Sequence, residues 1–328
     1  MSRRILPTPA GVGRTLSLLL CAACLHVNNV YAALLAYEPF EFGDVAVPSE
    51  GQYALGDENA ETNLLGGQSP VIGPTAFYDG PWITSGTDGQ AVKAEPSLSY
   101  PNFQAGIGGV VRETLQFDCC TFGRTGRAIA DGGLGAGRSA RTIYQSFLID
   151  FGSQGTDDPA EFGKHGYEMW NGGIGDEFLA VDLFLNHFSS VNTLSLAVTT
   201  VSGSETVSLA GDLSLDDLLG THLAVLKFEF NPAPTPDVVT VFLDPVSPDE
   251  AFATPSASIS VPNSDLFITH HGAYTQYTFS GEGHVPGAID EIRWGDAFGD
   301  VTPLDVPEPT TLGMLALLGS LTALRRRR

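Results

Sequence analysis

The middle of the chain is built from short apolar runs in which side chains alternate with a period of two. Residues Thr142–Phe151 carry apolar side chains on both faces, which is typical of a central strand between packed sheets. Residues His222–Phe230 alternate in the same way, and Val238–Leu243 follows a proline-rich turn as the return strand. Strands at intervals of roughly ten residues, separated by turn residues, predict an all-β sandwich of the jelly-roll type in a single domain.

Further strands are expected where short apolar runs are bounded by glycine, proline or polar residues. The first, Leu34–Phe42, is an edge-like strand broken by Pro39. The others are Ser97–Pro101, Tyr167–Trp170, Phe178–Leu185, Thr193–Val201, Glu205–Leu209, Leu266–Thr269 and Ala288–Trp294. The glycine-rich stretch Gly123–Gly137 predicts a loop, and Trp82 is expected to anchor the core or a sheet face.

Residues 1–32 have the parts of a secretory signal peptide. Arg3, Arg4 and Arg14 form a positive leader, and the run Leu16–Leu25 is apolar. Val30-Tyr31-Ala32 then supplies the small residues of a cleavage site. We expect the export machinery and signal peptidase to remove this segment between Ala32 and Ala33, with cleavage after Ala33 or Ala36 as alternatives.

Residues 304–328 form a second signal-like segment. The motif Val306-Pro307-Glu308-Pro309 reads as an extended, exposed tether because proline fixes φ and lacks a backbone N–H. The apolar run after it has ~13 residues and is shorter than the ~20 of a stable spanning helix. The terminal arginines would stay on the cytoplasmic side. The side chains expected in a short membrane helix are Leu312, Met314, Leu315, Leu317, Leu318, Leu321 and Leu324, and the basic stop is Arg325, Arg326, Arg327 and Arg328.

This tail resembles the PEP-CTERM sorting signal of bacterial secreted proteins, through Pro307-Glu308-Pro309, the apolar segment and the arginines. The resemblance implies that an exosortase-type membrane protease acts near the motif and releases or transfers the protein to the cell surface. The expected location is therefore the cell surface or the extracellular space, with transient or retained anchoring in the inner membrane. The alternatives are an ordinary C-terminal anchor and a terminal helix folded onto the body.

The body, residues 33–303, resembles the concanavalin A-like (LamG/lectin-type) jelly rolls of secreted bacterial proteins. The residues that carry this resemblance are Leu35-Ala36-Tyr37-Glu38-Pro39-Phe40, Ser97-Leu98-Ser99-Tyr100-Pro101, the pair His222–Phe230 and Val238–Pro245, and Ile289-Asp290-Glu291-Ile292-Arg293-Trp294-Gly295. The resemblance implies a lectin-like sandwich, with extracellular polysaccharide as a candidate partner. Lectin-type jelly rolls often hold Ca²⁺ with loop oxygens, and the candidate ligands here are Asp157, Asp158, Asp176 and Asp296.

The chain is strongly acidic, with 38 Asp and Glu against 16 Lys and Arg and a net charge of −22. Such a body repels nucleic acid and anionic membranes, so a nucleic-acid partner is not expected. Five of the basic residues gather in one region, namely Arg112, Arg124, Arg127, Arg138 and Arg141. They are either a patch for an anionic glycan or, as we favour, partners of the surplus carboxylates.

Cysteine usage excludes a disulfide-stapled fold. Cys21 and Cys24 lie in the signal peptide, which leaves only the adjacent pair Cys119-Cys120. Neighbouring cysteines reach ordinary disulfide geometry only with a strained backbone. A strained vicinal disulfide, two free thiols and an intermolecular link all stay open.

The sequence holds no recognisable catalytic constellation. Glycoside hydrolases need carboxylates that flank the sugar from the same face, whereas adjacent Asp290 and Glu291 should point to opposite faces and cap or solvate a terminal strand. Of His270 and His271, one is expected to pack and the other to face water. Trp170 and Trp294 are candidates for stacking on sugars, with a core position favoured for both.

These patterns predict a non-catalytic protein of the cell surface or matrix, with a glycan-binding or structural role. The alternative is a secreted polysaccharide-active enzyme, a hydrolase or lyase, on the same jelly roll. No metal ligand set and no catalytic residue is assigned.

Overall fold

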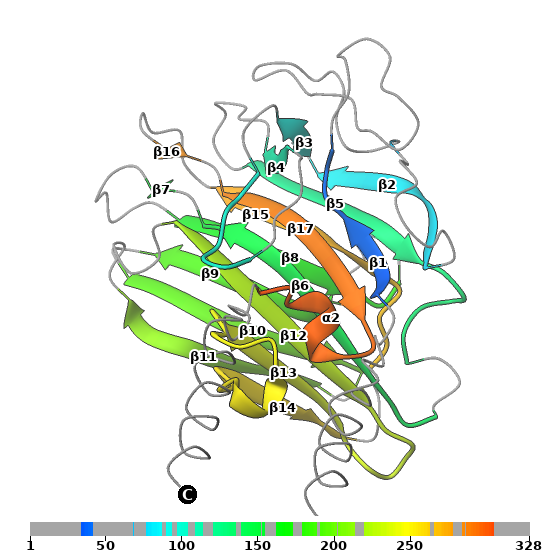
Figure 1. Ribbon diagram of the computed structural model, residues 1–328. Coiled ribbons are helices and arrows are strands. Elements are labelled where there is room, and N and C mark those ends of the chain that lie inside the picture. Colours follow the sequence, from blue (N-terminus) through cyan, green and yellow to red (C-terminus); the bar gives the residue numbers. More distant parts are fainter. Residues whose placement is uncertain are drawn as a thin grey trace, which may run out of the picture. The chain divides into compact units, whose positions relative to one another are not determined.

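The structure is a computed structural model of the 328-residue chain (Figure 1). It describes residues 34–41, 68, 77–86, 90–93, 97–103, 109–113, 121–135, 139–151, 153–154, 162–172, 179–188, 191–201, 203–213, 220–262, 266–277, 284–285 and 287–304. Both predicted signals, with Ala32, Ala33 and Val306–Arg328, and the pair Cys119-Cys120 lie outside these residues. Within the described part, no helix is long and apolar enough to cross a membrane.

Two antiparallel sheets form the body. The eight-stranded sheet has the order β14-β13-β12-β6-β17-β4-β3, with β1 paired to β17. Its strands are β1 (Leu34–Glu38), β3 (Gln90–Lys93), β4 (Val110–Glu113), β6 (Arg141–Asp150), β12 (Thr221–Phe230), β13 (Asp237–Leu243), β14 (Ala257–Val261) and β17 (Ala288–Gly295).

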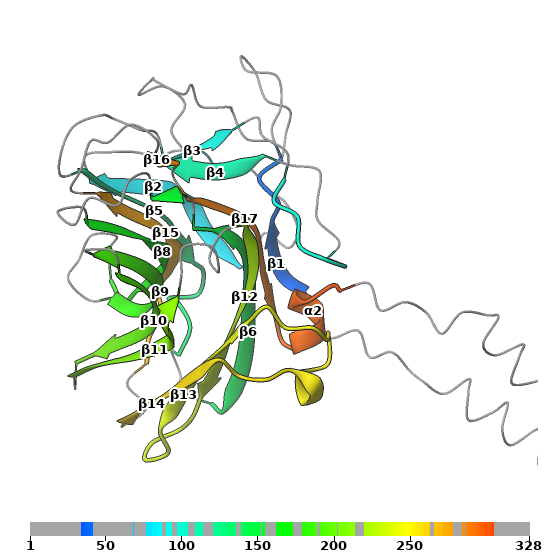
Figure 2. The same cartoon turned by 90° about the vertical axis from the view of Figure 1, so that its left-hand side faces the viewer.

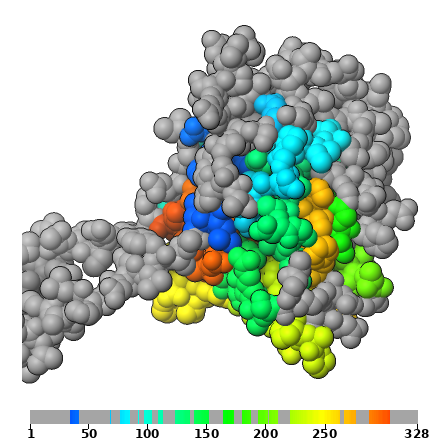
Figure 3. Space-filling model, turned by 90° about the vertical axis from the view of Figure 1, so that its right-hand side faces the viewer, coloured from blue at the N-terminus to red at the C-terminus, as the bar shows by residue number. Residues whose placement is uncertain are grey.

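The seven-stranded sheet has the order β11-β10-β9-β8-β15-β5-β2. Its strands are β2 (Tyr78–Gly86), β5 (Thr121–Ile129), β8 (Phe162–Trp170), β9 (Leu179–Phe188), β10 (Val191–Thr200), β11 (Gly203–Leu213) and β15 (His270–Tyr277). Figure 3 shows part of this order on the surface, with cyan β2, green β5 and orange β15 side by side. A separate two-stranded sheet joins β7 (Ser153–Gln154) and β16 (His284–Val285). This arrangement is the all-β jelly-roll sandwich that the sequence predicts.

The main core lies between the two sheets. Alternate side chains of β6 and β12, among them Phe147 and Phe228, face it from the eight-stranded sheet. The ring of Phe147 stacks on Tyr167 of β8, with ring centroids 4.2 Å apart. Trp82 is buried in this core, as expected. Burial of many large apolar side chains on facing sheets is the main stabilising contribution.

A second apolar layer covers the outer face of the eight-stranded sheet. Leu148, Leu223 and Phe242 point outward from β6, β12 and β13 and pack with Phe298. Phe298 opens the one-turn helix α2 (Phe298–Val301), which lies on the outer side of β17 in the edge-on view of Figure 2. Because both faces of β6 and β12 are covered, both strands carry apolar side chains on both sides, and the two-faced pattern of Thr142–Phe151 is confirmed.

Three local predictions are wrong. Much of Gly123–Gly137 is strand β5, and the turn follows only after Ile129. The glycines are needed for close strand contact: Gly126 pairs with Gly272, and a Cβ on Gly272 would lie 1.9 Å from the Thr125 carbonyl oxygen. Glycine inside this strand therefore marks a close backbone approach.

The second error is Ser97–Pro101, which forms an irregular segment over the outer face of the eight-stranded sheet, where Leu98 and Phe103 pack. The third is Leu266–Thr269, which contributes one isolated bridge, between Ile268 and Leu134. The main strand of that region, β15, begins only at His270. Its sequence is rich in histidine, glycine and tyrosine and lacks the aliphatic alternation that marks β6.

Candidate functional site

A pocket of about 200 Å³ opens where the two sheets end on the same side of the sandwich. Its walls are β11, the last strand of the seven-stranded sheet, with its neighbour β10, and β14, the last strand of the eight-stranded sheet. Figures 1 and 2 both show β11 and β14 at the same end of the molecule. The lining residues are Val198, Thr200, Gly203, Ser204, Glu205, Ile259, Ser260, Val261 and Pro262.

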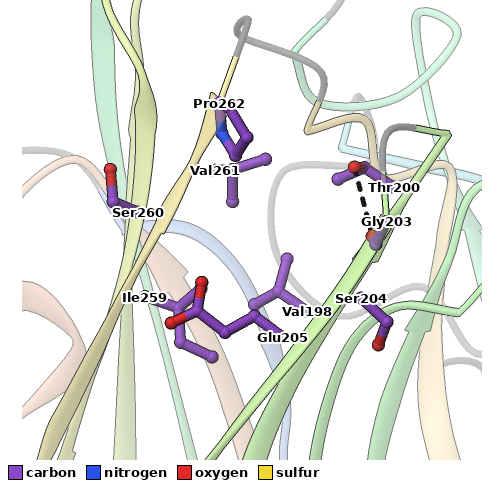
Figure 4. Close-up of a pocket in the computed structure, with 9 residues that line it drawn as sticks. All are labelled: Val198, Thr200, Gly203, Ser204, Glu205, Ile259, Ser260, Val261 and Pro262. Atoms are coloured by element: carbon purple, nitrogen blue, oxygen red, sulfur yellow. Dashed lines mark hydrogen bonds between the residues drawn. The ribbon is translucent and has the colours of Figure 1, made fainter.

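The period-two alternation of the strands decides which side chains enter this open-edge pocket. Val198 pairs directly with Glu205 across β10 and β11, so both point to the same side. Ile259 and Val261 belong to the core-facing side of β14. Figure 4 shows these four side chains directed into the gap, with the hydroxyls of Ser204 and Ser260 turned away.

The pocket therefore combines one carboxylate with apolar walls. Glu205 is exposed and occupies the position that continues the core-facing row of Val207 and Leu209 on β11. Thr200 lies at the rim and donates a hydrogen bond to the Gly203 carbonyl at 3.4 Å. A carboxylate between aliphatic side chains suits a small ligand with hydroxyl or amino donors and one apolar face.

A charged cluster lies on the outer face of the seven-stranded sheet. Lys164 Nζ is 2.5 Å from Asp182 Oδ2 and 3.2 Å from Glu168 Oε1, and Arg124 Nε is 3.0 Å from Glu168 Oε2. The Lys164 ammonium also lies over the rings of Phe184 and Tyr274, at 4.3 and 4.6 Å from their centroids. Glu168 and Asp182 face each other directly across β8 and β9.

Both carboxyl groups of this cluster are withdrawn from water. Glu168 is 0% and Asp182 3% exposed, and Asp182 Oδ1 has no hydrogen-bond partner among the residues that the structure describes. Burial raises the pKa of Asp182 to about 7, although the Lys164 ammonium opposes this shift. The cluster thus places a carboxyl group of raised pKa and a second carboxyl group in contact with the same amine.

Asp290 and Glu291 do not cap or solvate a terminal strand as predicted, because both are fully buried. A β-bulge between Asp290 and Arg293, with Glu291 at a positive φ of 55°, places both carboxylates on the outer side of β17 rather than on opposite faces. Asp290 accepts hydrogen bonds from the Leu98 and Glu291 amides, at 2.9 and 2.8 Å.

Glu291 accepts from Tyr37 at 2.6 Å and from Arg293 at 3.0 Å. These bonds tie β1 and the segment that holds Leu98 to β17. The pair thus has a clear structural role.

Three of the five gathered arginines pair with carboxylates, as favoured from the sequence. Arg124 binds Glu168, Arg127 binds Glu38, and Arg141 binds Asp296. Arg112 lies on β4, and Arg138 lies outside the described residues.

The other candidates fall as follows. Trp170 and Trp294 are fully buried, which confirms a core position and removes both from sugar stacking. His271 is buried and His270 half-buried, as expected. Asp157, Asp158 and Asp176 lie outside the described residues. Within those residues, no group of three or more His, Cys, Asp or Glu side chains could hold a metal ion, and calcium stays a prediction.

The sequence reasoning missed both the open-edge pocket and the charged cluster. For the cluster, a signal was present. Lys164 is one of only three lysines, and Asp182 interrupts the apolar run Leu179–Leu185. A carboxylate inside an apolar strand requires a buried partner. For the pocket, no local signal exists, because its walls are β10–β11 and β14, which are some fifty residues apart in sequence and neighbours only in the fold.

Comparison with known proteins gives one sequence match and several structural likenesses. Residues 305–328 match the family described as the PEP-CTERM protein-sorting motif. A search of curated proteins finds no match to the chain.

Among solved structures, an endo-β-1,4-glucuronan lyase from the fungus Trichoderma reesei is 10% identical, with 83% of this chain and 99% of that chain covered and a TM-score of 0.42. An endo-1,3-β-glucanase from Streptomyces sioyaensis is 9% identical, with coverages of 80% and 95% and a TM-score of 0.39. Lectin II from Ulex europaeus is 10% identical, with coverages of 65% and 92% and a TM-score of 0.35.

Likenesses at this level say nothing about which activity the chain has. The motif match is of another kind, because it falls on the segment in which the sequence shows Pro307-Glu308-Pro309, the apolar run and the arginines in order. The chain therefore carries a PEP-CTERM sorting motif at its C-terminus, the signal of a protein exported and processed through the exosortase machinery.

Proposed function

We propose that this protein is retained at the cell surface or in the extracellular matrix, where its sandwich has a non-catalytic, glycan-binding role. Surface delivery is supported by the sorting motif. Glycan binding is supported by the open-edge pocket, in which Glu205 stands between the aliphatic side chains of Val198, Ile259 and Val261. A sugar ring presents hydroxyl donors at its rim and C–H groups on its face, so it complements such a lining.

The charge of the pocket selects among glycans. Glu205 would repel the carboxylate of a uronic acid, and the net charge of −22 adds to this repulsion. A neutral or amino sugar is therefore the favoured ligand class. The non-catalytic role is supported by Asp290 and Glu291, because both carboxylates accept hydrogen bonds from other residues of the fold.

Glycan binding is tested by calorimetric titration of neutral, amino and uronate oligosaccharides into the folded protein. We expect binding of a neutral or amino sugar and binding by Glu205→Ala that is about tenfold to hundredfold weaker, because a charge-assisted hydrogen bond contributes about 1.5–3 kcal/mol. Thr206→Ala is the matched control, since Thr206 is the next exposed residue on β11 and does not line the pocket. Equal affinities for both variants, or no binding of any sugar, would contradict the proposal.

A polysaccharide-active enzyme is the second candidate, and a different observation supports it. Asp182, with a pKa near 7, faces Glu168 across two strands. A buried carboxyl group of raised pKa beside a second carboxyl group is a common acid–base arrangement. Release of reducing or unsaturated sugars by the wild type, abolished by Asp182→Asn and retained by Asp290→Asn, would favour the enzyme over the binding protein.

A further inference from the structure

Lys164 and Asp182 form the shortest contact between a lysine and a carboxylate among the described residues. Nζ and Oδ2 are only 2.5 Å apart, and the side chains are 14% and 4% exposed. The pair Lys227–Glu250 offers a comparison, at 2.8 Å with side chains 18% and 33% exposed. Water therefore reaches the Glu250 carboxylate, whereas the Asp182 carboxylate is almost completely shielded.

The geometry of β8 explains how Lys164 reaches this carboxylate. Lys164, Gly166 and Glu168 share one face of the strand, and Asp182 lies opposite Glu168 on β9. Gly166 leaves the position between them without a side chain, so the lysine stem can run along the strand. An added Cβ on Gly166 would also lie 2.3 Å from the Leu183 carbonyl oxygen, which makes glycine a requirement of this strand pair.

We propose that Lys164 and Asp182 form an intramolecular amide bond, for which Glu168 carries the protons. Lys164 Nζ attacks Asp182 Cγ, the Nζ–Cγ bond forms and one Cγ–Oδ bond breaks. An ammonium and a carboxylate together yield one amide and one water molecule, so no oxidant, reductant or other co-reactant is needed. The bond joins β8 to β9 on the outer face of the seven-stranded sheet, and it is independent of glycan binding at the open edge.

Each group in the cluster has a role in this step. The rings of Phe184 and Tyr274 flank the amine and exclude water, which favours condensation over hydrolysis. Burial raises the pKa of Asp182 to about 7 and so favours its neutral form, from which water can leave. Burial lowers the pKa of Lys164, but the facing carboxylates of Asp182 and Glu168 outweigh this and raise it, so the amine needs a base.

Glu168 is placed to be that base. Its Oε1 lies 3.2 Å from Lys164 Nζ, within reach of the proton that the amine must lose. Its Oε2 accepts from Arg124 Nε at 3.0 Å, which holds the carboxyl group in place beside the amine. Starting from a neutral Asp182 and a charged Lys164, the amine gives up two protons in all. One passes through Glu168 to the leaving oxygen and the other is released to solvent, so that the products are the amide and one water molecule.

The test is the intact mass of the folded, purified protein after denaturation. We expect the wild type to be about 18 Da lighter than its sequence, the mass of one water. Trypsin should leave Lys164 uncut, so that Thr142–Lys227 is recovered as one peptide, and a second protease should leave two peptides joined at Lys164 and Asp182. Lys164→Arg, Asp182→Ala and Glu168→Gln should each show the full sequence mass.

Two further variants make the result specific. Asp182→Asn should lose ammonia, about 17 Da, in place of water, since an amide side chain can undergo the same attack. Lys227→Arg is the matched control and should retain the water loss of the wild type. A wild-type chain of full mass that trypsin cuts after Lys164 would overturn the proposal, as would a mass loss that survives Lys164→Arg.

Discussion

Replacement of Glu38 by glutamine is expected to lower the free energy of unfolding by about 3–5 kcal/mol. Glu38 ends β1 in the eight-stranded sheet, and its carboxylate pairs with Arg127 of β5 in the seven-stranded sheet. The two side chains are 1% and 6% exposed. Loss of the carboxylate charge would leave a guanidinium buried between the sheets with reduced compensation.

The surroundings of Arg127 explain why relaxation cannot remove this cost. Its Nε donates to the Gly80 carbonyl at 3.1 Å, and its guanidinium lies 4.5 Å from the centroid of the Tyr78 ring. These contacts hold the guanidinium in place inside the sandwich. The double variant Glu38→Leu/Arg127→Met removes both charges together. We therefore expect its free energy of unfolding to be much closer to that of the wild type than the value for either single variant.

Urea unfolding of Glu38→Leu, Arg127→Met and the double variant measures this coupling, with Glu38→Gln measured beside them. The control is Arg141→Ala, which breaks the surface pair with Asp296, whose side chains are 50% and 45% exposed. Arg141→Ala should lower the free energy of unfolding by less than about 1 kcal/mol. If Glu38→Gln costs no more than this control, the buried pair does not hold β1 to β5 as described.

Acid is expected to destabilise the protein through His271. The imidazole of His271 is fully buried, and its Nδ1 is in hydrogen-bond contact with the Tyr167 hydroxyl, which also accepts from Gln145 at 2.6 Å. Protonation of His271 would place a charge in this buried position. Burial lowers the pKa of His271 well below its ordinary value, and the charge of Arg127 lowers it further.

The sign of the pH dependence follows from proton linkage. Below about pH 6.5 the unfolded chain binds a proton at His271 that the folded chain does not bind. The contribution of His271 to the free energy of unfolding therefore falls as the pH drops, by up to about 1.4 kcal/mol per pH unit. The fall ends once the pH reaches the lowered pKa that His271 has in the folded protein.

Comparison of the wild type with His271→Gln isolates this contribution from that of the carboxylates. The variant should lose less stability than the wild type between pH 7.5 and 5, measured by urea unfolding at each pH. His270→Gln is the control, because His270 lies on the same strand but is only half-buried. This variant should change the pH dependence of the free energy of unfolding less than His271→Gln does. Parallel pH profiles for the wild type and His271→Gln would show that His271 is not the acid-sensitive group.

The fold was predictable where single strands carry the signal. β6 and β12 have apolar side chains on both faces because one face meets the core and the other meets the layer around Phe298. The errors come from residues whose role depends on a distant partner. From the sequence, Gly126 was predicted to lie in a loop, and only its pairing with Gly272 shows that it belongs to a strand. Asp290 was predicted to face solvent, and only the hydrogen bond from the Leu98 amide shows that it is covered.

The candidate sites were less predictable for the same reason. Lys164, Glu168 and Asp182 come together only through the register of β8 on β9. Glu205 meets Ile259 and Val261 only because the two sheets end on the same side. The tail is the opposite case, since Pro307-Glu308-Pro309 and the residues after it form a linear signal that needs no fold to be recognised.

The central claim is that the protein is exported and sorted through its tail, and one measurement tests it most directly. It is the mass of the mature chain recovered from the surface and membrane fractions of cells. The account predicts a chain that begins near Ala33, keeps β1, and ends between Pro307 and Thr311 without the terminal arginines. A chain that is found only in membranes and still ends at Arg328 would contradict it.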